Sequence, residues 1–587
     1  MNASRQLLTD QIDIWTAAKA EKKSGRGRSS GNGISVYGIK KLRELILELA
    51  VRGKLVPQDP KDEPASELLK RIQAEKAKLV AEGKIKKGKL LPSLKDEEKK
   101  FELPQGWKWV RLKNIVYILG DGLHGTPIYT PDTECYFVNG NNLDNGQIII
   151  KPETKTVSLE EMKKHRKDLN ERTILVSING TIGRAAFYNN ENIVLGKSAC
   201  YFNLANLIYK NFVKLLLESP YFLDYAKNSV SGTTIMNLSL FAMNNFPLAI
   251  PPLSEQHRIV AKVDELMALC DQLESQHNNA AEAHEKLVNH LLGTLTQAQS
   301  AEDFSTNWQR IAAHFDTLFT TESSIDALKQ TIFELAVMGT LSYPQQSDTP
   351  ITTLLEKIVY EKKSLGISKK EEEAHANEYS ASLDATENNR VRLKTRFLCD
   401  FITKGTTPAQ TELLVEGDVP FLKVYNIVNN QIDFDYRPIF ISNDIHQTKL
   451  NRSKLYPGDV IMNIVGPPLG KIGIISDQYK EWNMNQALAV FRPLAGIYNR
   501  YLFCMLSTKS ILESVLTEVK GTAGQDNLSL EQCRNLLIPI PSIEEQHRIV
   551  AKVDELMAVC DQLKTSITEA NLLQQKLADG VVEQAVV

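Results

Sequence analysis

The chain has 587 residues, enough for several domains with substantial cores. A formal net charge of −2, with 24% charged and 7% aromatic residues, is typical of an ordinary globular protein. Apolar runs long enough to span a bilayer are absent, and Met1–Asp10 lacks the hydrophobic region of a signal peptide. We therefore expect a protein that does not span a membrane. Nucleic-acid binding stays open, because phosphate is bound by a local patch rather than by net charge.

The seven cysteines are scattered singly and form no CxxC pair. This usage favours a reducing cytoplasm and predicts no metal site. Two of the cysteines, Cys270 and Cys560, occupy equivalent apolar positions in predicted helices, where a thiol acts as a small hydrophobic group.

From the N-terminus, Met1–Thr16 predicts a short helix and Lys19–Gly33 a basic, Gly- and Ser-rich linker. Ile39–Arg52 predicts a helix with one apolar face, which Gly53 ends. Pro64–Glu82 predicts a second, charged helix. Leu103–Pro252 follows as a globular segment whose short β-branched runs are broken by Gly, Asn, Pro and Asp, a pattern that favours an α+β domain.

A long helix is predicted from about Ser254 to Leu295, about 60 Å at roughly 1.5 Å per residue. Its first apolar residues alternate in steps of four and three, which predicts a coiled-coil seam. We expect the seam to consist of Ile259, Val263, Leu266, Cys270 and Leu273, continued more weakly by His277, Ala280, His284, Leu287 and Leu291.

The stretch from Glu255 to Leu273 returns almost unchanged from Glu545 to Leu563, with Val559 in place of Leu269. We therefore expect two equivalent long helices that pack on each other; the alternative is that each buries one face in its own domain. Because polar positions such as Glu255/Glu545 and Arg258/Arg548 are also identical, we expect both helices to present the same surface to the same kind of partner. The second seam is predicted at Ile549, Val553, Leu556, Cys560 and Leu563, continued by Ile567, Ala570, Gln574, Leu577 and Val581.

The repeat extends over most of the chain. Ile325–Leu341 mirrors the helix that begins at Ile39, and a second globular segment spans Arg390–Pro541. Within the two globular segments, Ile174–Gly180 corresponds to Val460–Gly466, and both segments share an apolar pattern while their polar tips differ. The sequence thus predicts two related modules that recognise different targets on a common support.

These features carry a family resemblance. Leu-Pro-Gln-Gly-Trp-Lys-Trp at Leu103–Trp109, the paired Glu-Gln-His-Arg-Ile-Val sequences that begin at Glu255 and Glu545, and the duplicated plan resemble the specificity (S) subunit of a type I restriction–modification system. The long N-terminal helical region resembles the EcoAI-like (type IB) subfamily. One departure is that Asp384–Asn389 stands where the first globular segment has its Pro-Gln-Gly-Trp opening, so the second is expected to start near Val391.

The resemblance implies an α+β chain in which two α/β target-recognition domains are joined by two long antiparallel helices in a coiled coil, with a pseudo-two-fold repeat. It implies that each domain reads one half of a bipartite, asymmetric DNA site, and that the helices set the spacing of the half-sites and dock two modification (M) subunits. It also implies a non-catalytic chain without a cofactor of its own. S-adenosylmethionine for adenine methylation would belong to the M subunits, and ATP and Mg to the restriction (R) subunits.

The expected division of the chain is a helical region with a linker, a first recognition domain, a central helical region, a second recognition domain and a C-terminal spacer helix. The corresponding residues are 1–102, 103–252, 253–389, 390–541 and 542–587.

Candidate DNA contacts are polar residues on predicted turns, because arginine or lysine suits guanine and asparagine or glutamine suits adenine. Each is also an ordinary turn-forming or capping residue. The candidates are Thr126, Asn139, Asn141, Asn142, Lys164, Arg166, Asn179, Arg184, Lys197, Thr233 and Thr234 in the first domain, and Thr406, Lys423, Tyr425, Asn426, Asn463, Lys471, Asn485, Gln486, Thr522 and Gln525 in the second.

Some of these patterns have a second interpretation. The basic run Lys163–Lys167 fits phosphate contact and a solvated helix face equally well, and Gly-Thr pairs such as Gly125-Thr126 fit phosphate contact or a tight turn. His257 and His547, near the starts of the long helices, are expected to be packing or capping residues and not catalytic ones.

Two other classes of function remain. A self-standing DNA methyltransferase needs a glycine-rich cofactor turn and an Asn/Asp-Pro-Pro-aromatic loop, and Gly466-Pro467-Pro468-Leu469 lacks both the preceding acid or amide and the aromatic residue. A coiled-coil adaptor whose globular domains bind proteins is the other alternative.

Overall fold

The computed structural model describes residues 12–17, 36–87, 91–231, 236–366, 369–384, 389–466, 469–516 and 527–586. Of the helix expected over Met1–Thr16, only α2 (Ile12–Ala17) lies in these ranges, and the Lys19–Gly33 linker lies outside them. The chain forms two compact units, one of Met1–Ala281 with Glu569–Val587 and one of Glu282–Thr568. Each unit is described by itself below.

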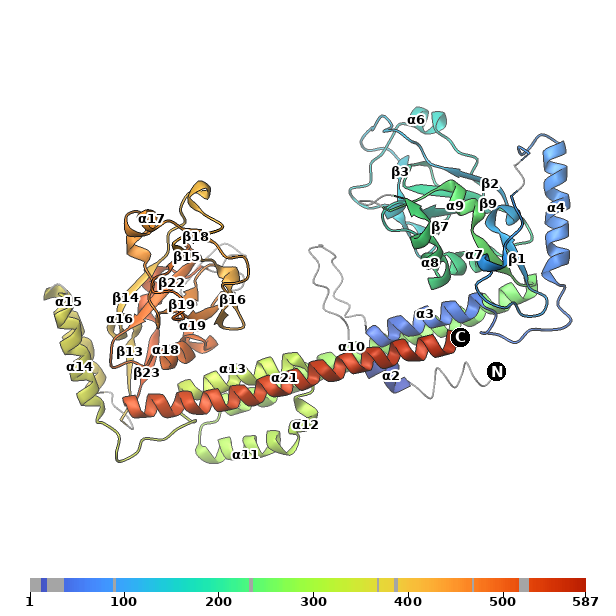
Figure 1. Ribbon diagram of the computed structural model, residues 1–587. Coiled ribbons are helices and arrows are strands. Elements are labelled where there is room, and N and C mark those ends of the chain that lie inside the picture. Colours follow the sequence, from blue (N-terminus) through green and yellow to red (C-terminus); the bar gives the residue numbers. More distant parts are fainter. Residues whose placement is uncertain are drawn as a thin grey trace. The chain divides into compact units, whose positions relative to one another are not determined.

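Unit 1 consists of an N-terminal helical pair, an α/β domain, and parts of both long helices (Figure 1). We call the part from β1 to β12 domain 1. The elements are α2 (Ile12–Ala17), α3 (Tyr37–Val51), α4 (Ala65–Ala81), η1 (Asp96–Glu98), β1 (Lys108–Arg111), α5 (Leu112–Ile115), β2 (Val116–Asp121), β3 (Tyr136–Val138), η2 (Gly140–Asn142), β4 (Leu143–Asp144), β5 (Gln147–Ile148), α6 (Leu159–Lys164), β6 (Thr173–Ser177), β7 (Ala185–Phe187), β8 (Ile193–Leu195), β9 (Ala199–Leu204), α7 (Lys210–Glu218), α8 (Pro220–Ser229), β10 (Val230–Ser231), β11 (Asn237–Leu238), α9 (Leu240–Asn245), β12 (Pro247–Ile250) and the first part of α10 (Leu253–Thr296).

Unit 2 repeats this order with additions, and we call the part from β13 to β23 domain 2. The elements are the last part of α10, α11 (Ala301–Ala313), α12 (Phe315–Leu318), α13 (Glu322–Met338), α14 (Ile351–Ser364), α15 (Lys369–Asp384), β13 (Val391–Lys394), α16 (Thr395–Leu398), β14 (Cys399–Lys404), η3 (Gln410–Glu412), β15 (Val419–Leu422), η4 (Val424–Asn426), β16 (Ile427–Val428), β17 (Gln431–Ile432), β18 (Phe440–Ile441), α17 (Asn443–Gln447), η5 (Asn451–Ser453), β19 (Val460–Asn463), β20 (Ile472–Ile474), β21 (Asn483–Met484), β22 (Leu488–Pro493), α18 (Asn499–Leu506), α19 (Lys509–Leu516), α20 (Leu530–Asn535), β23 (Leu537–Ile540) and the first part of α21 (Ile543–Val586).

The two domains share one topology, which confirms the predicted repeat and the α+β fold class. Domain 1 has a four-stranded antiparallel sheet in the order β2-β9-β6-β7, and domain 2 has β14-β22-β19-β20. A parallel pair, β3 with β8 and β15 with β21, accompanies each sheet, and β1–β12 and β13–β23 pair the two ends of each domain. The sheet strands β6 and β9 are buried along their whole length, as their apolar sequences require.

The helix that precedes each domain ends in the same way. Gly53 after α3 and Gly339 after α13 adopt left-handed backbone angles, with φ of 72° and 74°. The N–H of Lys54 then donates to the carbonyl oxygen of Leu49, and the N–H of Thr340 donates to that of Leu335. Glycine suits this position because it has no Cβ to oppose a positive φ.

The first residues of the predicted seams are buried, whereas part of the predicted continuation is not. Ile259, Val263 and Leu266 of α10 are buried in unit 1 together with Ala578 from the end of α21, and the partly buried Val581 packs against them. The start of α21 is likewise buried in unit 2, together with Val288, Leu292 and Leu295 from the end of α10. In each unit, therefore, the start of one long helix shares a core with the end of the other, so the two helices run antiparallel.

The predicted continuation is wrong at Leu287 and Leu577, which are about half exposed. Val288 and Ala578 are buried instead. Val288 lies about five helical turns, at roughly 3.6 residues per turn, beyond Cys270, and Ala578 lies equally far beyond Cys560. These buried positions therefore follow the period of a straight α-helix and not the 3.5-residue period of a heptad.

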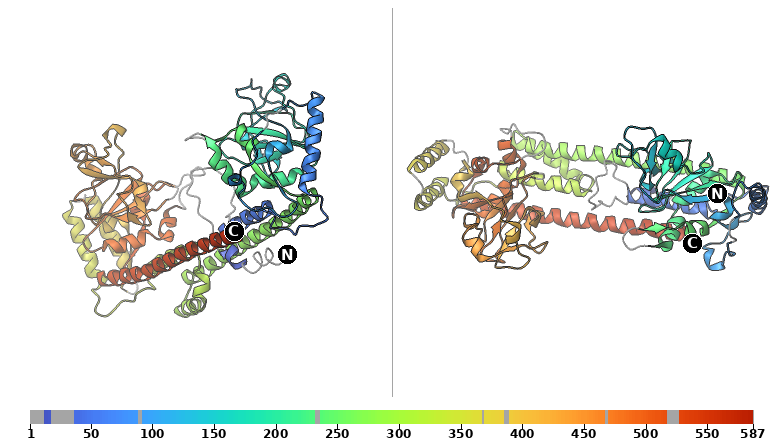
Figure 2. Two further views of the ribbon diagram at one scale, coloured as in Figure 1. Left: turned by 45° about the vertical axis from the view of Figure 1, so that its right-hand side comes forward. Right: turned by 90° about the horizontal axis from the view of Figure 1, so that it is seen from above.

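Helices α3 and α13 each lie along the long helices of their own unit (Figures 1 and 2). In unit 1, Arg43 of α3 forms ion pairs with Asp271 and Glu274 of α10, and Lys41 pairs with Asp579 of α21. In unit 2, the pairs are Lys329 of α13 with Asp561, and Asp326 with Lys564. The same three-helix arrangement is thus held by different polar contacts in the two units.

Unit 2 has helices that the sequence patterns did not predict. Helices α11, α12 and α15 have no counterpart among the described residues of unit 1. Tyr379 of α15 is buried, and its hydroxyl donates to the carbonyl oxygen of Phe397 in α16, while His375 packs edge-on against the Phe397 ring. Helix α15 therefore packs against α16 at Phe397.

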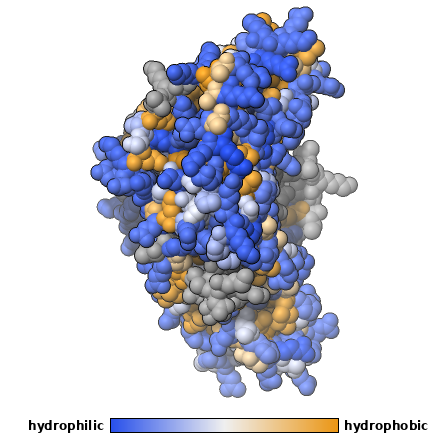
Figure 3. All heavy atoms as spheres, turned by 90° about the vertical axis from the view of Figure 1, so that its right-hand side faces the viewer, coloured by the Kyte–Doolittle hydropathy of each residue, from blue (hydrophilic) through white to orange (hydrophobic). Residues whose placement is uncertain are grey.

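All seven cysteines lie in the described residues, and all are buried without a disulfide. Burial raises the pKa of Cys270 to about 11 and that of Cys200 to about 12. The thiols are therefore parts of the hydrophobic cores. Among the helices that the structure describes, none combines the length and apolarity needed to cross a membrane. In the view of Figure 3, the surface is mostly hydrophilic with scattered hydrophobic side chains.

His446 of α17 lies in a polar cluster that has a defined protonation state. Its side chain is buried, and its Nδ1 accepts a hydrogen bond from Nδ2 of Asn483 (3.0 Å). The amide of Asn483 is oriented by the N–H of Met484, which donates to Oδ1, and by the carbonyl oxygen of Leu450, which accepts from Nδ2. Nδ1 of His446 therefore carries no proton, and Nε2 donates to Glu481 (3.0 Å).

We expect acid to destabilise domain 2 through His446. Burial lowers the pKa of His446 below its ordinary 6.5, so the unfolded chain takes up a proton at a higher pH than the folded chain does. The stabilisation is complete above pH 6.5 and decreases as the pH falls below that value. Urea unfolding of the wild type and of His446→Gln across this range checks the prediction, and an unchanged pH dependence in the variant would contradict it.

Candidate nucleic-acid interface

Four turns of domain 1 meet at one end of the sheet, and we call this group of turns polar edge 1. They follow β2, β3, β6 and β8. The turn after β8 is the centre: the N–H of Leu123 donates to the carbonyl oxygen of Leu195, and the N–H of Ile178 donates to that of Ser198 (3.0 Å). The hydroxyl of Ser198 accepts from the N–H of Gly140 (2.8 Å). Residues distant in sequence are thus fixed next to one another.

Polar edge 1 brings together several of the predicted contact residues. Asn139 is half-buried, and its Oδ1 accepts a hydrogen bond from the hydroxyl of Ser198 (2.9 Å). Asn141 and Lys197 on the neighbouring turns are exposed. Asn179, after β6, is half-buried and pairs with Asn237 in an isolated β-bridge. These side chains occupy one surface of the domain.

Polar edge 2 is the corresponding group of turns in domain 2. The N–H of Gly405 donates to the carbonyl oxygen of Leu488, as Gly122 does to Ala199. Lys423 is half-buried and Gln486 is exposed, and the N–H of Gln486 donates to the hydroxyl of Thr407 (3.4 Å). The backbone framework is therefore the same at both edges, although the side chains differ.

Other candidates around polar edge 2 are partly covered. Tyr425 is half-buried, its hydroxyl donates to the carbonyl oxygen of Arg437 (3.3 Å), and burial raises the pKa of the phenol. Thr406, Lys471 and Asn485 are also half-buried. Asn485 lies in the central turn, where its N–H donates to the carbonyl oxygen of Leu422 (3.0 Å).

Three of the candidate DNA-contact residues stabilise the turns themselves. Asn142 and Asn426 are buried, and each Oδ1 accepts the N–H of the residue three positions earlier while the amide nitrogen donates to backbone carbonyl oxygens. Asn463 is also buried, and its Oδ1 accepts from the N–H of Val465 (3.2 Å). Their amides are engaged inside the domains.

The remaining candidates differ in their position. Lys164 and Arg166 are exposed at and just beyond the end of α6, with Nζ of Lys164 3.6 Å from Glu161. Thr126 and Arg184 are exposed on loops next to polar edge 1. Thr233, Thr234, Thr522 and Gln525 lie outside the described residues.

Ser198 and Thr407 are the residues at these edges that the sequence patterns missed. Both are small hydroxyl residues that hold a turn in place. In the sequence, Ser198 is marked only by its position beside the candidate Lys197, and Thr407 only by its position beside the candidate Thr406. These are weak signals, because serine and threonine are common in turns.

The polar residues that the two long helices share are used within each unit. Gln256 is buried, its Oε1 accepts the N–H of Tyr209 (2.8 Å), and its Nε2 donates to Pro251 (3.0 Å). Gln546 makes the same two contacts, with Tyr498 and Pro541 (2.9 and 3.1 Å). These contacts fix each domain on the start of its own long helix.

The neighbouring residues that are identical in the two long helices also make contacts within their own units. Arg258 pairs with Asp62, and Arg548 pairs with Asp348. His257 stacks on Tyr209 with ring centroids 3.9 Å apart, and His547 lies 4.2 Å from Tyr498. The expectation of a shared partner surface is therefore wrong for the buried Gln256 and Gln546. The partly exposed Arg258 and Arg548 form equivalent intramolecular contacts in the two units. The structure agrees with a packing role for the two histidines.

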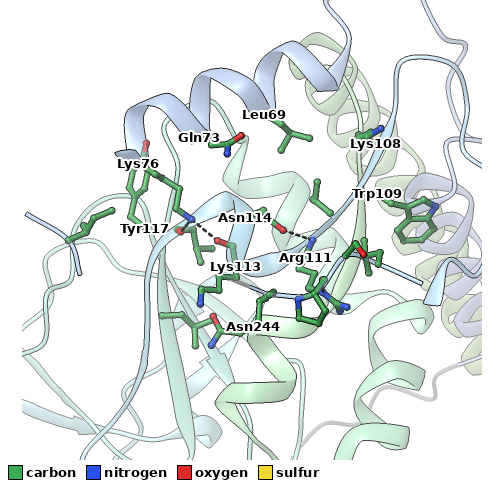
Figure 4. Close-up of a pocket in the computed structure, with 18 of the residues that line it drawn as sticks. Leu69, Gln73, Lys76, Lys108, Trp109, Arg111, Lys113, Asn114, Tyr117 and Asn244 are labelled. Atoms are coloured by element: carbon green, nitrogen blue, oxygen red, sulfur yellow. Dashed lines mark hydrogen bonds between the residues drawn. The ribbon is translucent and has the colours of Figure 1, made fainter. Parts of the chain in front are cut away.

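A basic pocket of about 940 Å³ lies beside α4 in unit 1 (Figure 4). Nζ of Lys76 donates to the carbonyl oxygens of Lys113 (2.7 Å) and Val116 (2.9 Å), and burial together with Lys113 lowers the pKa of Lys76 to about 8. Lys362 of α14 makes the equivalent contact with Cys399. The pocket adjoins the start of β2 and polar edge 1 adjoins its end, so they are separate surfaces. In the part of the chain that the structure describes, no cluster of His, Cys, Asp and Glu is placed to hold a metal ion.

The chain has two domains of one fold. Each is fixed to a long helix and carries a different polar edge, which is the architecture of a protein that recognises a two-part target. The family model described as the type I restriction modification DNA specificity domain matches residues 104–283 and 392–572. The chain belongs to this family of type I restriction–modification specificity proteins.

The chain is similar over its full length to specificity subunits from Escherichia coli. It is 35% identical to the EcoAI specificity subunit, with 99% of each chain covered, and 32% identical to the EcoEI specificity subunit, with 99% of this chain and 100% of the relative covered. A solved structure described as the basis of complex assembly and conformational transition of the type I R-M system is 18% identical, with 83% of this chain and 99% of that chain covered and a TM-score of 0.45.

Proposed function

We propose that domains 1 and 2 each read one half of a bipartite, asymmetric DNA site, so that this chain is the DNA specificity subunit of a type I restriction–modification system. The observation that carries this proposal is that the two domains have the same backbone framework but different polar edges. Two copies of one reading module with different side chains suit a site whose halves differ. Full-length similarity to the EcoAI and EcoEI specificity subunits supports the same function.

Base contacts are proposed for the accessible side chains of the polar edges, because these side chains can enter the major groove. Asn142, Asn426 and Asn463 are left out because their amides are engaged inside the domains. The proposed base contacts are Asn139, Asn141, Asn179 and Lys197 in domain 1, and Lys423, Tyr425, Asn485 and Gln486 in domain 2. Thr126, Lys164, Arg166, Arg184, Thr406 and Lys471 are proposed to contact phosphate, which positions a protein on DNA without reading sequence.

The catalytic steps of such a system belong to other subunits, and this chain is the non-catalytic part. We propose that two M subunits, which hold S-adenosylmethionine, and R subunits, which use ATP and Mg, assemble with this chain in the cytoplasm. The proposed role of the chain is to select the site and to support the M subunits.

Exchanging one domain tests the proposed function. Replacing Leu103–Pro252 with the matching segment of the EcoEI specificity subunit should change one half of the recognition site and leave the other half unchanged, because the joint to α10 uses residues outside the reading turns. Methylation-site mapping in cells that carry the chimera and its M subunits measures both halves. If both halves change, or neither changes, the modular function is wrong.

A further inference from the structure

Two positions of polar edge 1 correspond to two positions of polar edge 2. The N–H of Gly196 donates to the carbonyl oxygen of Val138 (2.8 Å), and the N–H of Asn485 donates to that of Leu422 (3.0 Å). The residues that follow these pairs therefore correspond. Asn139 stands where domain 2 has Lys423, and Lys197 stands where domain 2 has Gln486.

An amide and a lysine are thus present at both edges, but in exchanged places. Domain 1 has the amide at the half-buried inner position and the lysine at the exposed outer position. Domain 2 has the lysine inside and the amide outside. Among the described residues, Nδ2 of Asn139 and the side-chain groups of the other three residues have no hydrogen-bond partner, so these groups are available to a ligand.

We propose that each pair forms the two adjacent base-reading positions of its domain, and that Ser198 decides which base the inner amide accepts. The proposal rests on the proposed function, because it names the residues that would carry it out. The hydroxyl of Ser198 donates to Oδ1 of Asn139 (2.9 Å) and occupies one of the two acceptor positions of this oxygen, which favours Nδ2 as the group that Asn139 offers to a base. Domain 2 has Ala487 at the position of Ser198, where the N–H of Ile464 donates to its carbonyl oxygen.

The chemistry of the two edges follows from these donors and acceptors. Adenine is read by an amide that both donates to N7 and accepts from the N6 amino group, whereas guanine presents only acceptors, N7 and O6, to the major groove. With one acceptor position of its oxygen taken by Ser198, Asn139 acts mainly as a donor, and Lys197 is a donor only. Edge 1 is therefore selective for guanine-type acceptor patterns. Edge 2 combines the donor Lys423, which suits guanine, with Gln486, whose free amide suits adenine.

Two substitutions test this inference in the full chain with its M subunits. Ser198→Ala frees Oδ1 of Asn139, so one base pair of half-site 1 should shift from guanine towards adenine. Gln486→Glu replaces an amide with an acceptor-only carboxylate on an exposed side chain, so one base pair of half-site 2 should shift from adenine towards cytosine. For each variant we compare the methylation of sites that carry the original base at this position with that of sites that carry the new base. Their ratio should change on the order of ten- to hundredfold, as expected for a bidentate contact. Ala487→Ser is the matched control, because Lys423 cannot accept a hydrogen bond, and it should leave both half-sites unchanged.

The measurement is methylation-site mapping of the whole genome for each variant. If Ser198→Ala keeps the wild-type unfolding temperature and leaves half-site 1 unchanged, Ser198 does not decide which base Asn139 accepts. If Ser198→Ala disturbs the turn through the lost contact with Gly140, the shift expected for Gln486→Glu still decides whether the reading positions are assigned correctly. If Gln486→Glu leaves both half-sites unchanged while the domain exchange still alters half-site 1, the assignment of the reading positions is wrong and the modular function stands. If the domain exchange also has no effect, the proposed function itself fails.

Discussion

Glu545→Ala should lower the free energy of unfolding of unit 2 by about 3–5 kcal/mol, the cost of breaking a buried ion pair from one side. The Glu545 side chain is fully buried and pairs with Arg390, whose guanidinium also donates to the carbonyl oxygens of Gly339 (3.2 Å) and Ser342 (2.8 Å). Removing the carboxylate leaves a largely buried cation without its counter-ion at the point where α21, the end of α13 and domain 2 meet. Thermal unfolding and hydrogen exchange of the amides near Arg390 measure the effect.

Two variants on the long helices serve as controls. Glu555→Ala removes an exposed partner of Lys552 on the same helix and should change the stability by less than about 0.5 kcal/mol. Glu255→Ala, the equivalent change in unit 1, removes an acceptor from the neutral donors Trp107 and Gln58 and should cost about 1–3 kcal/mol. Equal losses for Glu255→Ala and Glu545→Ala would contradict the assignment of a buried charge pair to unit 2 alone.

Gly122→Ala should abolish recognition of half-site 1, because the new methyl group would collide with the turn at the centre of polar edge 1. A Cβ at Gly122 would lie 2.2 Å from the carbonyl oxygen of Gly196 and 2.4 Å from that of Leu195, and these backbone atoms can give way only if the turn moves. Overpacking of this kind costs about 1–3 kcal/mol. DNA binding by the complex, together with the unfolding temperature, measures both effects.

The same loop offers a matched control for this substitution. A Cβ at Gly125 meets no atom within 4 Å, so Gly125→Ala should leave binding and stability unchanged. Gly405 in domain 2 has the same close approach, 2.2 Å to the carbonyl oxygen of Asn485, and Gly405→Ala should affect half-site 2 only. Normal recognition of half-site 1 by Gly122→Ala would show that the turn after β8 does not contribute to reading.

Periodicity and internal repetition made much of the fold predictable. The helix predicted over Ile39–Arg52 is α3, the long helix predicted from Ser254 is α10, and Ile174–Gly180 matches Val460–Gly466 in strands β6 and β19. The continuation of the seam failed at Leu287 because Leu287 and Val288 are both apolar, and the choice between them depends on a helix period that differs only slightly from the heptad. Helix α15 has too weak an apolar stripe to be predicted.

The candidate site was predictable as a set of turns but not residue by residue. Asn139 and Asn142 are both asparagines on one predicted turn, yet the amide of Asn142 points inward and caps the backbone while Nδ2 of Asn139 stays available. The roles of Glu255 and Gln256 were also missed, because their partners Trp107 and Tyr209 are distant in sequence. A pattern of residue types does not show which way a polar side chain faces.

The buried cysteines have a practical consequence for labelling. Thiol reagents attack the thiolate, and burial both excludes the reagent and keeps thiols such as Cys200 and Cys270 protonated at neutral pH. A cysteine introduced at Gly125, where the surrounding space is open, would therefore be the site that maleimide dyes modify in the folded chain. A fluorophore could be attached beside polar edge 1 without first replacing the seven native cysteines.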